Sequence, residues 1–121
     1  MTIMKRLRIG IATKEQYKAR TIAIAAGKYK PAVDEPKIWF PSLESLAKVL
    51  SDKNRELLAL IARTSPSSLN ELSLRTGRAK SNLSRTLHTM ERYGLVKLEK
   101  GEGRQLAPRV DYTNLEFEVS L

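Results

Sequence analysis

Residues 68–104 read SLNELSLRTGRAKSNLSRTLHTMERYGLVKLEKGEGR and contain the most regular pattern in the chain. A short helical pattern ends at Gly77, and a longer one over about residues 79–93 ends at Gly94. The apolar pair Leu95-Val96 opens a strand over 95–100. The turn Gly101-Glu102-Gly103 precedes a return strand over 104–112, in which Pro108 favours an edge position. Helix, glycine, helix and hairpin, in this order, indicate a compact α+β unit that is mainly α.

The ends of the two helices are marked by residues with defined capping chemistry. Ser68 and Glu71 have the three-residue spacing of a capping box, which satisfies the free amides of a helix start. Gly77 suits the left-handed position that follows a helix end. The sequence therefore predicts a winged helix-turn-helix with an N-terminal strand–helix extension, a fold that places its second helix in the major groove of DNA.

The longer helix divides into an apolar and a basic face. At ~100° per residue, Leu83, Leu87 and Met90 form one stripe, and Arg78, Ser81, Arg85 and Arg92 lie ~160–220° around from Leu83. Arginine can donate two parallel hydrogen bonds to guanine, and asparagine can pair with adenine. An ordinary solvated helix face can have a similar composition. The basic face described here belongs to a helix that follows a helix–glycine turn, and this position favours DNA contact.

The candidate DNA contacts include the flanks of this helix and the hairpin. The helix start lacks a capping side chain, because Arg78 and Ala79 occupy the expected positions; its free amides would meet a phosphate or water. Lys97, Lys100 and Arg104 could contact phosphate or the minor groove, unless the hairpin is simply a surface turn. The candidate DNA-binding residues are Arg78, Lys80, Ser81, Asn82, Arg85, His88, Arg92, Lys100 and Arg104.

The rest of the chain is less regular. Residues 3–12 alternate as a strand, and a helix over 14–26 begins with the capping pair Thr13 and Gln16. Prolines interrupt 28–41, where Trp39 and Phe40 indicate a core or a subunit contact. Two further helices are expected over 43–50 and 53–64, the first capped by Ser42 with Leu43 and Leu46 on its apolar face. A terminal strand is expected over 115–119. We predict an extension over residues 1–40, for dimerisation or partner binding, and a winged-helix domain over 41–121.

Composition limits the classes of function. The 121 residues contain 22 Lys and Arg against 13 Asp and Glu, a net charge of +9 that favours a polyanionic partner. Cysteine is absent, which excludes disulfides and thiolate chemistry. The single histidine, His88, has no companion ligand, and no phosphate-loop motif occurs. We therefore expect no enzymatic activity, no metal site, no cofactor and no membrane association.

The quoted stretch resembles the winged-helix transcriptional regulators of the MarR type and their archaeal and bacterial relatives. SLNELSLRTG is similar to their supporting helix, KSNLSRTLHTMERYGLV to the reading helix, and KLEKGEGR to the wing. The resemblance implies that Ser81, Asn82 and Arg85 are base readers and that Arg104 is a wing contact. The first 40 residues depart from the long dimerisation helices of that family, and short regulators of this kind also resemble antitoxins encoded beside a toxin.

The expectation is a cytoplasmic, sequence-specific regulator that binds double-stranded DNA as a homodimer. The alternatives are an antitoxin-like repressor whose N-terminal segment binds a toxin protein, an RNA binder, and a winged-helix protein adaptor. Candidate dimer contacts are the strand around Ile9, the 14–26 helix, Trp39 with Phe40, and the terminal strand. The two strands at opposite ends of the chain could pair with each other, within one subunit or between two.

Overall fold

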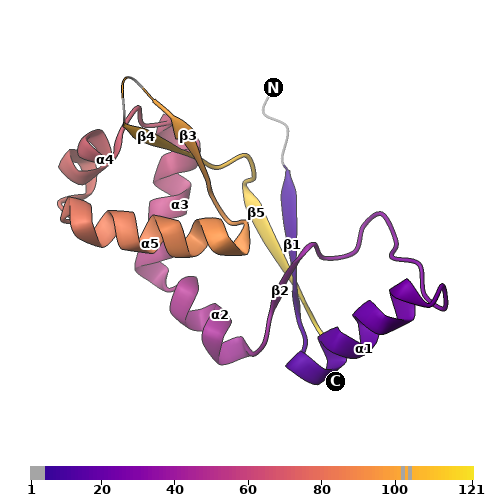
Figure 1. Ribbon diagram of the computed structural model, residues 1–121. Coiled ribbons are helices and arrows are strands. Elements are labelled where there is room, and N and C mark those ends of the chain that lie inside the picture. The colour runs from indigo at the N-terminus through magenta and orange to yellow at the C-terminus, as the bar shows by residue number, and fades with distance from the viewer. Residues whose placement is uncertain (1–4, 102, 104) are drawn as a thin grey trace. The chain divides into compact units, whose positions relative to one another are not determined.

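A computed structural model describes residues 5–101, 103 and 105–121 (Figure 1). The elements follow the chain in the order β1 (Arg6–Ile11), α1 (Lys14–Ala25), β2 (Ile38–Phe40), α2 (Leu43–Val49), α3 (Asp52–Thr64), α4 (Leu69–Thr76), α5 (Lys80–Tyr93), β3 (Lys97–Lys100), β4 (Leu106–Arg109) and β5 (Asn114–Val119). Within these described residues, no helix is long and apolar enough to cross a membrane.

The chain forms two compact units. Unit 1 comprises the chain up to Lys48 together with Asn114–Leu121, and unit 2 comprises Val49–Thr113. The sequence had suggested a division between residues 40 and 41, with the terminal strand in the winged-helix domain. The difference arises because the terminal strand, β5, pairs with β1 at the other end of the chain and therefore belongs to unit 1.

Unit 1 is built on a three-stranded sheet of order β2-β1-β5, in which β1 is parallel to both neighbours. In this register Ile9 lies between Ile38 and Phe117, so apolar side chains share one face of the sheet. Gly10 lies opposite Trp39 on the other face, and a Cβ at Gly10 would come within 2.4 Å of the Trp39 ring. The strands at the two ends of the chain thus pair within one subunit.

Helix α1 contacts this sheet through a few aromatic and charged side chains. Its capping box is present as predicted, since the Gln16 amide donates to Thr13 Oγ1 and Thr13 N donates to Gln16 Oε1. The Tyr17 and Trp39 rings are 6.1 Å apart, and the Arg20 guanidinium lies 5.0 Å from the Trp39 ring. None of the residues of α1 is buried. Helix α1 is therefore attached to unit 1 at one side only.

The short helix α2 differs from its prediction in the residues that it buries. Ser42 caps it as expected, because Ser45 N donates to Ser42 Oγ at 3.1 Å. Leu46 is buried, whereas Leu43, expected on the same apolar face, is 56% exposed. The helix begins at Leu43, so this side chain lies in the first turn, and Leu46 is the buried residue of the helix.

Unit 2 has the arrangement of a winged helix-turn-helix, in agreement with the fold class predicted from the sequence. Helices α4 and α5 flank the turn at Gly77, and β3 and β4 form an antiparallel hairpin in which Pro108 lies opposite Leu98 (Figure 1). The core is made of Leu57, Leu58, Ile61, Leu72, Leu83, Leu87, Met90, Leu95, Val96, Ala107 and Tyr112. Within it, the Tyr112 hydroxyl donates to the Leu95 carbonyl at 2.7 Å, which connects the end of the hairpin to its beginning.

Candidate nucleic-acid interface

The turn between α4 and α5 is fixed by side chains on both sides of Gly77. Gly77 has φ +73°, the left-handed conformation predicted from the sequence. The Ser73 hydroxyl donates to the Arg78 carbonyl at 2.7 Å, and Arg78 N donates to Thr76 Oγ1 at 3.2 Å. These bonds satisfy backbone groups that the turn leaves outside both helices, and they set the direction in which α5 leaves α4.

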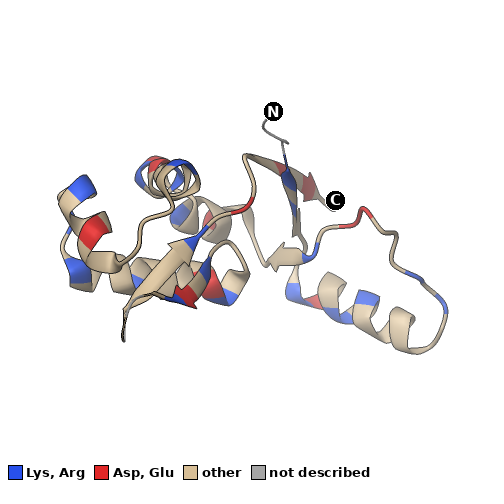
Figure 2. Ribbon diagram, turned by 90° about the horizontal axis from the view of Figure 1, so that it is seen from above, with Lys and Arg blue, Asp and Glu red and all other residues tan. Residues whose placement is uncertain are grey.

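Helix α5 has the two faces predicted from its periodicity. Leu83, Leu87 and Met90 are completely buried. Ser81, Arg85 and Arg92 lie on the opposite side and are exposed. Because the buried stripe fixes the rotation of α5 about its axis, the exposed face has a defined direction. The basic residues between 75 and 92 are Arg75, Arg78, Lys80, Arg85 and Arg92, against Glu91 alone (Figure 2).

Arg78 differs from the other basic residues of this group. It precedes α5, which begins at Lys80 rather than at Ala79, so the helical wheel does not apply to it. Its side chain is half-buried, and its guanidinium donates to Asn82 Oδ1 at 2.9 Å, to Thr86 Oγ1 at 3.2 Å and to Asn54 Oδ1 at 3.4 Å. These contacts direct the Arg78 side chain toward α3 and along α5.

The sequence did not identify Asn54 and Thr86 as parts of this site. Asn82 and Thr86 are spaced four residues apart, which aligns them along one side of α5, and Arg78 lies a further four residues before Asn82. This spacing is a signal that could have been read. The contribution of Asn54 from α3 depends on the tertiary structure and has no local signature.

The start of α5 has the open cap that the sequence predicted. The N-cap residue is Ala79, which makes no side-chain hydrogen bond to the helix, and the first turn contains no acidic residue. Lys80 and Ser81 are the first exposed side chains beyond it. The free amides of the helix start and the Lys80 side chain together give this end of α5 a positive potential.

His88 is exposed on α5, and its Nδ1 lies 2.7 Å from the Ser84 carbonyl oxygen. This contact orients the ring along the helix. No cluster of His, Cys, Asp and Glu suited to a metal ion occurs within 5–101, 103 and 105–121.

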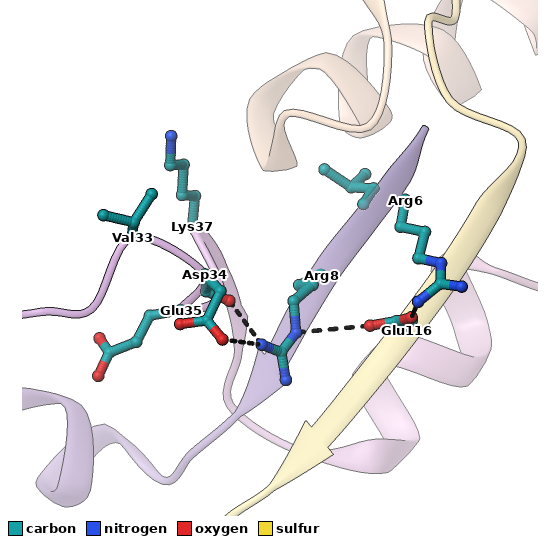
Figure 3. A pocket seen from close by; sticks show the side chains of 8 residues that line it. Arg6, Arg8, Val33, Asp34, Glu35, Lys37 and Glu116 are labelled. Carbon is teal, nitrogen blue, oxygen red and sulfur yellow. Dashed lines mark hydrogen bonds and ion pairs between the residues drawn. The ribbon is translucent and has the colours of Figure 1, made fainter. Parts of the chain in front are cut away.

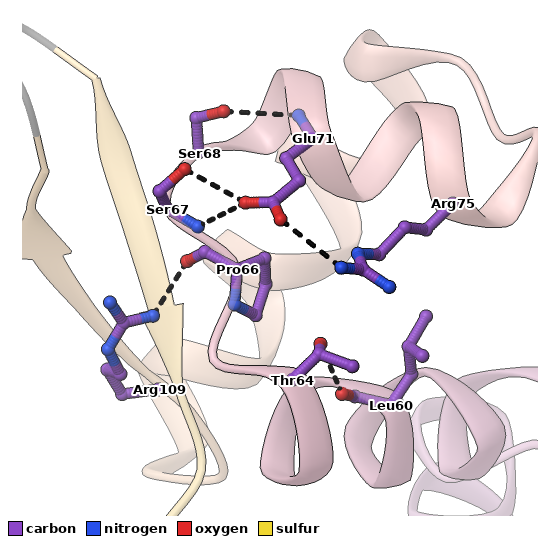
Figure 4. A network of polar contacts seen from close by, with 8 residues as sticks. All are labelled: Leu60, Thr64, Pro66, Ser67, Ser68, Glu71, Arg75 and Arg109. Atoms are coloured by element: carbon purple, nitrogen blue, oxygen red, sulfur yellow. Dashed lines mark hydrogen bonds and ion pairs between the residues drawn. The ribbon is translucent and has the colours of Figure 1, made fainter.

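The start of α4 is fixed by a network that reaches the hairpin (Figure 4). Glu71 Oε2 accepts from Ser67 N at 2.6 Å and from the Ser67 hydroxyl at 2.9 Å. The bond from the Ser67 amide, and then that from its hydroxyl, lowers the pKa of the Glu71 carboxyl. The Ser68 hydroxyl accepts from Glu71 N as a cap should, but the Glu71 carboxylate binds Ser67 rather than Ser68. Arg109 on β4 donates to the Pro66 carbonyl at 2.7 Å.

Strand β3 of the hairpin places its two lysines in solvent. Lys97 and Lys100 are exposed on β3. Gly101 N donates to the Gln105 carbonyl at 2.7 Å, and a Cβ at Gly101 would lie 2.6 Å from the Ser67 carbonyl oxygen. Glycine is therefore required where the hairpin passes the start of α4. Arg104, the wing contact proposed from the sequence, lies outside the described residues, as does Glu102.

Two cavities, one in each unit, differ in the balance of basic and acidic residues that line them. In unit 1, a pocket of about 590 Å³ has Arg8 donating to the Asp34 carbonyl at 2.6 Å, with Glu116 3.6 Å from its Nε (Figure 3). Glu116 also pairs with Arg6 at 3.0 Å. These charges hold the 33–37 segment against the sheet. In unit 2, a hollow of about 430 Å³ is lined by Lys53, Arg63, Arg75 and Arg78 with Glu56 as the acidic residue.

Comparisons with known proteins place unit 2 in a family. The model of the family HVO_A0114 matches residues 49–117. Among solved structures, one described as "Crystal structure of the predicted DNA-binding transcriptional regulator from E. coli" is similar, with 20% sequence identity and a TM-score of 0.47. The similarity covers 81% of this chain and 83% of that one. No curated protein matches the chain.

Proposed function

The chain belongs to the HVO_A0114 family, and from the geometry of its unit 2 we propose that it is a sequence-specific transcriptional regulator that binds double-stranded DNA. The observation that carries this proposal is the exposed face of α5. Ser81, Arg85 and Arg92 lie opposite a fully buried stripe, on the second helix of a helix-turn-helix. In this proposal α5 enters the major groove, as recognition helices do in this fold.

The exposed side chains divide between base and phosphate contacts. Arg85 has the donors to bind O6 and N7 of a guanine, and Ser81 and Asn82 are close enough to the helix start to reach neighbouring bases. Lys80, at the open cap of α5, would bind a phosphate. Lys100 on the hairpin, His88 and Arg92 on α5, and Arg104, the wing contact predicted from the sequence, would contact the backbone of the duplex.

A net charge of +9 supports this proposal through its physical effect on association. Lysine and arginine that neutralise phosphates release counterions, so affinity falls steeply with salt. The proposed setting is the cytoplasm, where the duplex is accessible. The proposed action is MarR-like repression, in which the bound protein blocks access to its site.

We further propose that unit 1 forms a homodimer. Helix α1 buries none of its residues, and Ile22 is 59% exposed. On β5, which is an edge strand of the sheet, Phe117 is 51% exposed and Val119 is 45% exposed. Apolar side chains left in solvent on two elements are typical of an interface. A two-fold dimer would read a palindromic site.

The same exposed side chains favour a second function. In an antitoxin-like repressor, unit 1 would bind a toxin protein through α1 and β5 while α5 binds DNA. Co-purification of a protein encoded beside this chain, at a fixed ratio, supports the antitoxin function. A homodimer that purifies alone and binds a palindrome supports the simple repressor.

The proposed function is tested by selecting bound duplexes from a random pool. The wild type should enrich one motif with two-fold symmetry. Arg85→Ala should weaken binding to that motif by about 1–3 kcal/mol and relax the base preference at one position of each half-site. Lys18→Ala, which removes one charge from exposed α1, is the control and should leave the motif unchanged.

Two results would contradict this function. If structured RNA competes with the selected duplex at equal affinity, the protein is an RNA binder. If the wild type enriches no motif and Arg85→Ala binds DNA as well as the wild type does, unit 2 is a protein adaptor.

A further inference from the structure

The guanidinium of Arg78 is occupied by contacts within unit 2. Nε donates to Asn82 Oδ1 at 2.9 Å, Nη2 to Thr86 Oγ1 at 3.2 Å and Nη1 to Asn54 Oδ1 at 3.4 Å. All three accepting atoms belong to neutral side chains, so the planar guanidinium is positioned by geometry rather than by an ion pair. An arginine that donated to guanine would have to give up part of this arrangement.

Asn54 is itself held in place on the side of α3. Its Nδ2 donates to the Val49 carbonyl at 2.9 Å, and its backbone amide donates to the Ser51 hydroxyl at 3.3 Å. Because the Nδ2 end of the amide faces Val49, the Oδ1 end faces Arg78. Asn54 thereby provides a fixed support for the Arg78 side chain at the start of the recognition helix.

The contact with Arg78 determines which end of the Asn82 amide faces outward. Asn82 is exposed on the first turns of α5. Its Oδ1 accepts from Arg78 Nε, so the amide cannot rotate to exchange oxygen and nitrogen without bringing two donors together. The Asn82 N–H₂ group is therefore the end directed at a ligand, and its partners are acceptors such as guanine N7 and O6.

We infer that Arg78 is a positioning residue that contributes to base selection through Asn82 and does not itself contact DNA. This inference rests on the proposed function. It assigns to Arg78 a different role from that of Arg85 and Arg92, although all three are arginines near the same helix. It also predicts that Asn82 reads DNA as a donor rather than as the two-sided partner of an adenine.

A double-mutant cycle tests this inference. The motif is selected and the affinity measured for the wild type, Arg78→Met, Asn82→Ala and the double variant. Methionine keeps the length and packing of Arg78 but has no donors. Arg78→Met and Asn82→Ala should each relax preference at the same base pair by about tenfold, and the double variant should relax it no further.

The salt dependence of binding distinguishes positioning from direct contact. If Arg78 touches no phosphate, Arg78→Met should leave the slope of log affinity against log salt concentration unchanged. Arg85→Ala and Lys18→Ala serve as comparisons, one on the proposed DNA face and one on α1. Arg78→Lys, which keeps the charge without the planar donors, should relax the base preference as Arg78→Met does. If Arg78→Met melts below the assay temperature, Arg78→Lys replaces it in the cycle.

A third variant tests the orientation of the amide. Asn82→Asp keeps an oxygen for Arg78 but has no N–H donors, so it should lose preference at the same base pair as Asn82→Ala. Retention of that preference in Asn82→Asp would overturn the donor assignment. Additive effects of Arg78→Met and Asn82→Ala, or a salt slope reduced by about one, would show that Arg78 contacts DNA and would overturn the inference. A wild type that selects no motif would instead overturn the proposed function on which the inference rests.

Discussion

Helices α1 and α5 are of similar length, 12 and 14 residues, but the structure holds them in different ways. Helix α5 has three completely buried side chains, at Leu83, Leu87 and Met90, whereas α1 has none. Helix α1 is defined by its Thr13 cap and by the contacts of Tyr17 and Arg20 with Trp39. An isolated helix of this length is marginal in water, so a helix in a protein owes most of its stability to packing. Helix α5 has such packing along its buried stripe, whereas α1 buries no residue.

The difference teaches where a functional face can be deduced from the sequence. A buried stripe fixes the rotation of a helix, and the opposite face is then determined as well. In α5 this reasoning leads to Ser81, Arg85 and Arg92. In α1 no stripe is buried, so the packing within unit 1 does not single out one face of this helix for the proposed partner.

The largest effect is expected from breaking the stripe of α5. Leu87→Ala should lower the free energy of unfolding of unit 2 by about 2–5 kcal/mol, because it removes a fully buried side chain and leaves a cavity. Ile22→Ala on α1 is the matched control, and it should change stability by less than about 0.5 kcal/mol in a monomer. Urea unfolding followed by far-UV circular dichroism measures both.

The control also sharpens the comparison. If Ile22→Ala destabilises the protein only at concentrations where the wild type is a dimer, while Leu87→Ala destabilises it at every concentration, Ile22 lies in a subunit interface. Equal, concentration-independent losses for the two variants would show that α1 is packed as firmly as α5, which the burial of their side chains contradicts.

An intermediate effect is expected from the contact that holds α1. Gly10→Ala would place a methyl group 2.4 Å from the Trp39 ring, so the ring must move away from Tyr17 and Arg20. We expect a loss of about 1–3 kcal/mol in unit 1, as for other overpacked sites. Trp39 is the single tryptophan of the chain, so its fluorescence and near-UV circular dichroism report on unit 1. In a Trp39→Leu background, measured by far-UV circular dichroism, Gly10→Ala should cost less; an undiminished cost would place the clash elsewhere.

The smallest effect concerns the cap of α4 and its dependence on pH. The pKa of Glu71 is lowered in the folded protein by its bonds from Ser67, so the ionised carboxylate favours folding. This contribution is complete above the unfolded pKa of about 4.3 and is lost as the pH falls through the lower, folded value. Glu71→Gln should therefore unfold more readily than the wild type at pH 7, and the difference should shrink below about pH 4. A difference in unfolding temperature that is the same at pH 7 and pH 3 would contradict this assignment.

The parts of the fold that the sequence predicted depend on local chemistry. The caps at Thr13, Ser68 and Gly77 and the buried stripe of α5 are all present, because each requires only residues within a few positions of one another. The position of Pro108 on an edge strand followed from its missing amide. These features are encoded by spacing and by the identity of single residues.

The parts that the sequence did not predict depend on contacts between distant residues. The sequence left open whether the terminal strand pairs with the first strand within one subunit or between two, since either pairing satisfies the alternation of Leu115, Phe117 and Val119. In the structure β5 pairs with β1 of the same chain and belongs to unit 1. Leu43 was expected to be buried because its spacing from Leu46 is helical, but exposure depends on what lies beside it. Arg78 was grouped with Arg85 and Arg92, and spacing cannot reveal that its guanidinium donates to Asn54, 24 residues away on α3.

The pairing of β1 with β5 has a consequence for the order in which the protein folds. Arg6 pairs with Asn114, so the central sheet of unit 1 has a very high contact order and cannot be completed until the C-terminal strand has left the ribosome. Unit 2 comprises the continuous segment Val49–Thr113 and can form during synthesis, while β1 has β2 beside it but still lacks β5 on its other edge. During that interval the β1 edge is open to strands of other nascent chains, so the period before β5 emerges is the stage at which this protein is most exposed to misassembly.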